Sequence, residues 1–129
     1  MTGVQTCTLP IWFIYDVAAY LQTLEMVKSM EAKLFIPAHA AVTDSIAELA
    51  QVNIDQVNEI AGRILALCET PCCFEELLRQ LFDVYALTMN FEQYVLVGST
   101  VRSYLAWLKD TGRLDVSFEE NRMLWRRKQ

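Results

Sequence analysis

Apolar residues recur at three- and four-residue spacing in long stretches of the chain, the pattern of one buried face of an α-helix. The stretches predict helices at about 16–33, 43–68, 73–83 and 90–111. Expected N-terminal caps are Asp16, Ser45 with Glu48, Cys73 with Glu76, and Asn90 with Gln93. Gly62 lies inside the second helix and indicates close packing or a bend, because glycine there costs about 1 kcal/mol relative to alanine.

The last of these helices has the clearest predicted inward face. Its apolar side chains at that spacing are Phe91, Tyr94, Val95, Val101, Tyr104, Leu105 and Leu108. Thr111 and Gly112 predict its end, since glycine suits the left-handed conformation that follows many helices.

Three short segments have strand character. Leu34 to Ile36 is continuously apolar and is stopped by Pro37, which is typical of a buried strand that ends in a loop. The segments 113–118 and 122–125 flank Glu-Glu-Asn and predict a β-hairpin. The fold class is therefore mainly α, with α+β character. Three helices and then a hairpin is the order of a winged-helix domain, expected at 43–126, although the same elements can assemble in other ways.

Composition narrows the class of protein. The 129 residues are 53% hydrophobic, enough for one compact core. A net charge of −5 repels a phosphate backbone and argues against nucleic acid as a partner. A small basic group ends the chain and is expected to be solvated: Arg122, Arg126, Arg127 and Lys128. No apolar run approaches the eighteen or so residues of a membrane span, so no membrane role is expected.

The four cysteines are Cys7, Cys68, Cys72 and Cys73. No second Cys and His cluster completes a four-ligand zinc site with the three in "CETPCC". Adjacent cysteines do not readily form a disulfide with each other, so we expect structural thiols in a reduced, cytoplasmic setting.

Residues 1–11, "MTGVQTCTLPI", fit none of these patterns. They resemble the conceptual translation of a short-read sequencing adapter, which would encode alanine at Thr8. The alternative is a genuine edge strand or a disordered arm. Segments of technical origin are excluded from fold analysis, so the natural sequence is expected to begin at about Trp12 and to continue upstream in the true protein.

From about Tyr15 onward the chain resembles bacterial hydrolases of the metallo-beta-lactamase fold that carry a winged-helix extension. The resemblance rests on "YDVAAYLQTLEMVKSM", on "LFIPAHA", which is similar to the strand-end motif Pro-Gly-His-Gly, and on two stretches after Asn53. It implies that 12–42 ends the catalytic domain, that 43–126 is the winged-helix domain and that 127–129 is a tail. It also implies that His39 is the last ligand of a dinuclear, usually zinc, site that activates water.

The chain departs from that family at the metal site. Ala38 and Ala40 replace the two usual glycines, and the other ligands, a His-x-His-x-Asp-His motif among them, do not occur in this sequence. A catalytic zinc needs about three protein ligands and an open position for water, which one histidine does not provide. The expectation is thus an inactive C-terminal part of a zinc hydrolase acting on a small-molecule substrate. The alternative is that His39 is a buried packing residue, with Asp44 in the first turn of the next helix.

A free-standing winged-helix module is the alternative function, and enzyme activity is left open. For nucleic acid, the polar side chains that the last helix offers are Glu92, Gln93, Ser99, Thr100, Arg102, Ser103 and Lys109, with only two cations. For protein partners, the apolar stripe of the first helix and Trp12, Phe13 and Ile14 predict self-association unless that helix folds back on the rest.

Overall fold

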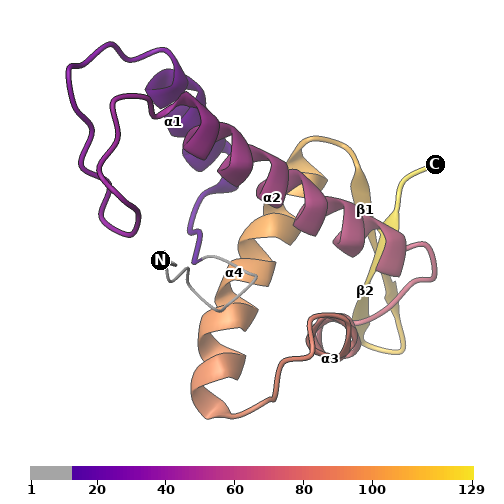
Figure 1. Ribbon diagram of the computed structural model, residues 1–129. Helices are drawn as coiled ribbons and strands as arrows, with labels where there is room; N and C mark the ends of the chain where they lie inside the picture. Colours follow the sequence, from indigo (N-terminus) through magenta and orange to yellow (C-terminus); the bar gives the residue numbers. More distant parts are fainter. Residues whose placement is uncertain (1–12) are drawn as a thin grey trace.

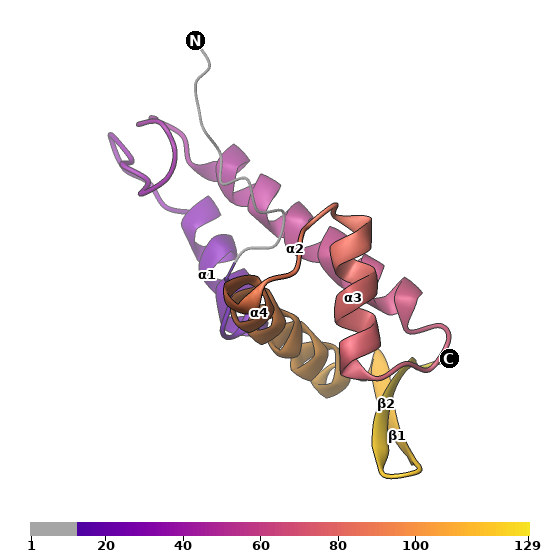
Figure 2. The same ribbon diagram turned by 90° about the horizontal axis from the view of Figure 1, so that it is seen from below.

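The computed structural model describes residues 13–129, and they form four helices and one antiparallel hairpin. The elements are α1 (Val17–Lys28), α2 (Ala47–Leu67), α3 (Phe74–Val84), α4 (Phe91–Asp110), β1 (Leu114–Glu119) and β2 (Arg122–Arg127). Helix α1 packs along α2, and α4 contacts both helices and passes behind α2 in the view of Figure 1. The hairpin extends from the helices next to the start of α3, and β2 contacts both α2 and α3 (Figure 2). The expected mixture of mainly α structure with a hairpin is confirmed.

Two of the expected helix caps are confirmed. The Asp16 carboxylate accepts the Ala19 N–H at 2.9 Å, and the Asn90 side chain accepts the Gln93 N–H at 2.8 Å. The reciprocal contact of Gln93 is not made, since its buried Oε1 has no partner. Each cap satisfies one of the donors that a helix leaves free in its first turn.

The predicted capping box at Ser45 and Glu48 is wrong. Helix α2 begins at Ala47, and its N-cap is Ile46, which makes no side-chain hydrogen bond. The preceding residues form a turn of their own, in which the Thr43 hydroxyl accepts the Ser45 N–H at 3.1 Å and donates to the Ser45 carbonyl at 2.9 Å. This local turn competes with the cap for the same backbone groups. Cys73 is the N-cap of α3, also without a side-chain bond.

Two helices end in the same backbone motif. After α4, Gly112 has a φ of 73°, and the Arg113 N–H reaches back to the Leu108 carbonyl at 2.8 Å, which confirms the predicted stop. After α3, Ala86 has a φ of 51° in the equivalent position. An alanine here is less favourable than glycine because its Cβ crowds the backbone.

One core joins all four helices and the hairpin. Its fully buried side chains include Val17 from α1, Ile60 and Ile64 from α2, Leu78 from α3, and Tyr104 from α4. The predicted inward face of α4 is correct only for its second half. Phe91 and Val95, expected inside, are exposed, and Tyr94 lies at the surface with its hydroxyl on Glu75.

The hairpin has a two-residue loop at Glu120 and Asn121. Their φ values of 48° and 62° give the backbone twist that suits a tight hairpin. Glu119 pairs with Arg122 and Leu114 with Arg127, so β2 continues two residues beyond the predicted strand. Cys72 forms an antiparallel bridge with Trp125, on the side of β2 away from β1. The order across the hairpin is therefore Cys72, β2, β1.

The predicted buried strand at Leu34 to Ile36 is wrong. Only Phe35 pairs, in a single antiparallel bridge with Thr43, and Leu34 and Ile36 are 56% and 78% exposed. No other strand lies beside them within the described residues 13–129, and the side chains of Leu34 and Ile36 stay exposed while Phe35 is half-buried. No helix in this part of the chain is long and apolar enough to cross a membrane.

Candidate functional site

His39 lies at the tip of the loop that joins α1 to α2, the long excursion beside those helices in Figure 1. The bridge between Phe35 and Thr43 closes the base of this loop, with N···O distances of 2.7 and 3.1 Å. Ala38 and His39 form a turn, and His39 is exposed. The interpretation of His39 as a buried packing residue is therefore wrong, because its imidazole faces solvent.

The loop brings no set of metal ligands to His39. Across residues 13–129 no group of three or more His, Cys, Asp or Glu side chains is placed to hold a metal ion. Asp44 is exposed and precedes α2 by three residues, so the expectation that it lies in the first turn of that helix is wrong. Glu48 is the acidic residue there. The loop thus presents one solvent-facing imidazole.

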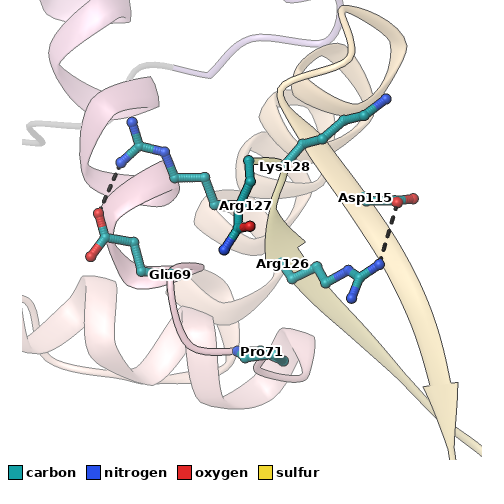
Figure 3. A pocket seen from close by; sticks show the side chains of 7 residues that line it. Glu69, Pro71, Asp115, Arg126, Arg127 and Lys128 are labelled. Atoms are coloured by element: carbon teal, nitrogen blue, oxygen red, sulfur yellow. Dashed lines mark hydrogen bonds and ion pairs between the residues drawn. The ribbon is translucent and has the colours of Figure 1, made fainter.

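A second candidate site is a surface cavity of about 340 Å³ beside the C-terminal basic residues. Figure 3 shows Arg126 and Arg127 leaving β2 on opposite sides, with Pro71 below both of them. Arg127 pairs with Glu69 at 2.9 Å and Arg126 with Asp115 at 3.7 Å. The prediction that this basic group is solvated is confirmed, because Arg126, Arg127 and Lys128 are all exposed. The first two nevertheless belong to a strand and each pairs with an acidic side chain.

The exposed side of α4 is the surface that a winged helix would present to a nucleic-acid groove. Thr100, one of the predicted contact residues, is buried and donates to the Leu96 carbonyl at 3.3 Å. Arg102 lies over the Phe74 ring at 3.6 Å from its centroid, so its guanidinium is engaged in a cation–π contact. Phe91 and Val95 leave the same helix apolar near its start. This surface is poor in available cations.

Three free thiols lie close to the junction of α2, α3 and β2. Cys68 and Cys72 are buried and Cys73 is half-buried. Interaction between the Cys68 and Cys72 thiols raises the pKa of Cys68 and lowers that of Cys72. No pattern in the sequence beyond their spacing indicated this contact. Cys7 lies outside the described residues.

Buried tyrosines form another group that the sequence did not single out for chemistry. The Tyr104 hydroxyl is fully buried and has no hydrogen-bond partner. Burial raises the pKa of Tyr104 above its usual value. Burial and a 2.8 Å hydrogen bond to Glu59 likewise raise the pKa of Tyr85. These phenols stay protonated at neutral pH and serve packing.

Comparison with known proteins gives no assignment. No known protein family matches the chain, and no curated protein matches it significantly.

Proposed function

We propose that this chain is the C-terminal part of a zinc-dependent hydrolase of the metallo-beta-lactamase fold, in which His39 supplies one metal ligand. The remaining ligands and the small-molecule substrate site would belong to a catalytic portion that is not in this sequence. The part described here would be inactive alone, because one imidazole leaves a catalytic zinc short of protein ligands.

The observation that carries this proposal is the exposed apolar segment at Leu34 to Ile36. Leucine, phenylalanine and isoleucine in sequence favour a strand buried on both faces. Here one residue pairs and the two beside it face solvent. Strands from the proposed catalytic portion would complete a sheet around this segment and would bring other ligands to His39, two residues after Pro37.

The rest of the chain supports a winged-helix assignment for 43–126. Helices α2, α3 and α4 are followed by a hairpin, and Cys72 adds a short third strand to β2 at the start of α3. That chain order and strand order are those of a winged helix. The domain would act as a structural support for the catalytic portion.

Sequencing the encoding locus upstream of codon 12 tests the proposal. We expect the reading frame to continue through a His-x-His-x-Asp-His segment and the codons of residues 1–11 to disappear. An in-frame stop codon directly upstream would contradict the proposal.

Metal analysis of the protein encoded by that longer frame tests the role of His39. We expect two zinc ions per chain, and His39→Ala should lose one of them with most of the hydrolytic activity. Asp44→Asn is the matched control, because Asp44 is exposed in the same loop. Unchanged zinc content in His39→Ala would refute the assigned ligand.

Nucleic-acid binding by a free-standing module is the competing proposal, and the ion pairs of Arg126 and Arg127 disfavour it. A fluorescent DNA duplex titrated with the chain at low salt should show no shift in anisotropy. Binding that weakens steeply with added salt would favour the competing proposal.

A further inference from the structure

Cys68 and Cys72 lie at a junction between helix and hairpin. Cys68 is the C-cap of α2, and Cys72 is the bridge residue before α3. Their side chains are 0% and 3% exposed and belong to the main core. The residues between them, Glu69, Thr70 and Pro71, are all exposed. Two buried thiols are therefore separated only by a short surface turn.

Strand β2 holds the backbones of both cysteines. The Arg127 N–H donates to the Cys68 carbonyl at 2.7 Å, and Cys72 and Trp125 exchange two hydrogen bonds of 3.1 and 2.9 Å. Trp125 and Arg127 are two residues apart on a strand, a separation of about 7 Å. Cys68 and Cys72 are thus held near the upper end of the Cα separations that disulfides span.

The Cys72 side chain also lies against the end of α2, next to Cys68. Cys72 Sγ lies 4.0 Å from the carbonyl oxygen of Leu67, the residue directly before Cys68. Interaction between the two thiols lowers the pKa of Cys72 and raises that of Cys68. Cys72 is accordingly the thiol that ionises first and attacks an oxidant, since the thiolate is the nucleophile.

We propose that Cys68 and Cys72 form a reversible disulfide when hydrogen peroxide oxidises the protein. The Cys72 thiolate attacks one peroxide oxygen, the O–O bond breaks, and a sulfenic acid and hydroxide result. The Cys68 sulfur then attacks the Cys72 sulfur and forms the S–S bond. The sulfenic hydroxyl leaves with the Cys68 proton as water. Two thiols are oxidised and one peroxide is reduced to two waters.

The bond would constrain the turn 69–71. This turn carries Glu69, the ion-pair partner of Arg127, and Pro71, at the base of the cavity in Figure 3. The redox state would therefore set the shape of the surface around the C-terminal cations. Both sulfurs are buried, so oxidation requires the exposed turn 69–71 to open. Hydrogen peroxide needs a smaller opening than a bulky disulfide such as oxidised glutathione does. The inference is independent of the proposed hydrolase.

The test uses the full chain carrying Cys7→Ser, with peroxide followed by alkylation of free thiols. We expect the number of alkylated thiols among Cys68, Cys72 and Cys73 to fall from three to one. Cleavage after Glu69 should leave the Cys68 and Cys72 peptides linked until dithiothreitol releases them. Oxidised glutathione at the same concentration should react at least ten times more slowly.

Cys73→Ser is the matched control, since it removes the neighbouring thiol and leaves a good helix cap. The linked peptides should persist in Cys73→Ser and vanish in Cys68→Ser and Cys72→Ser. A link that requires Cys73, oxidation of single thiols to sulfinic acid, or three unreacted thiols in the folded Cys7→Ser protein would each overturn the proposal. The peptide mapping of that protein decides the matter even if a variant fails to fold.

Discussion

At the scale of single residues, substitution by alanine is expected to change stability in opposite directions at Gly62 and Gly112. A Cβ added at Gly62 meets nothing within 4 Å, and the position is inside α2, more than one turn from its end. Gly62→Ala should therefore stabilise the protein by about 1 kcal/mol, because alanine loses less backbone entropy in a helix. Gly112→Ala should destabilise it by about 1 kcal/mol, since Gly112 has a φ of 73°. Urea denaturation of both variants measures the two signs, and a loss of stability in Gly62→Ala would show hidden crowding there.

The buried Tyr104 hydroxyl should make the stability of the protein depend on pH in the alkaline range. Burial raises its pKa in the folded protein above the usual 10.0, so the folded form keeps its proton while the unfolded chain loses it. The free energy of unfolding should therefore fall as the pH rises above about 10. Tyr104→Phe should flatten part of this fall and gain about 1 kcal/mol at neutral pH, because the hydroxyl has no partner.

Denaturation between pH 8 and 11 checks the Tyr104 prediction. Tyr15→Phe is the control, because it removes the same hydroxyl from a side chain that is 95% exposed. Its curve should follow that of the wild type. An equal effect of the two substitutions would show that burial of Tyr104 is not the cause.

At the scale of elements, α1 and α4 begin at a side-chain N-cap, whereas α2 begins without one. Asn90→Ala should cost about 1 kcal/mol, because it leaves the Gln93 N–H without its 2.8 Å acceptor. Ser45→Ala should cost almost nothing, because the Ser45 side chain makes no cap. Thermal unfolding of the two variants makes the comparison. An equal loss would mean that Ser45 caps α2 after all.

At the scale of the whole molecule, α1 covers part of the core. Val17 is 1% exposed, in the same cluster as residues of α2, α4 and the hairpin. Val17→Asp should cost more than 3 kcal/mol and should produce aggregation, since it buries an unpaired charge. Ala18→Asp, one residue further on and exposed, should leave a folded protein.

Light scattering and circular dichroism distinguish these two variants. The packing of α1 also bears on the self-association that was expected if this helix did not fold back. The α1 stripe that could have driven it is folded back on α2, and Ile14, expected at the surface with Phe13, is 5% exposed. A folded, monomeric Val17→Asp would show that α1 contributes little to the core.

Elements were predictable where their signals are local. The caps at Asp16 and Asn90, the stop at Gly112 and the turn before Arg122 depend on residues within one turn of each other. Leu34 to Ile36 could not be placed from sequence, because burial of a strand depends on neighbouring strands. The predicted burial of Phe91 and Val95 was wrong for a similar reason, because the elements that cover the second half of α4 do not cover these side chains near its start.

The candidate sites likewise combine features set by local sequence with features set by the packing of the elements. The sequence by itself determined the helices, the hairpin and a single histidine after a strand-like segment, because periodicity, caps and turn residues act over a few positions. Only the tertiary structure decided that His39 faces solvent, that Arg126 and Arg127 are paired, and that Cys68 and Cys72 are both held on β2. Exposure and contact between distant residues depend on how the elements pack, and a linear pattern does not contain that information.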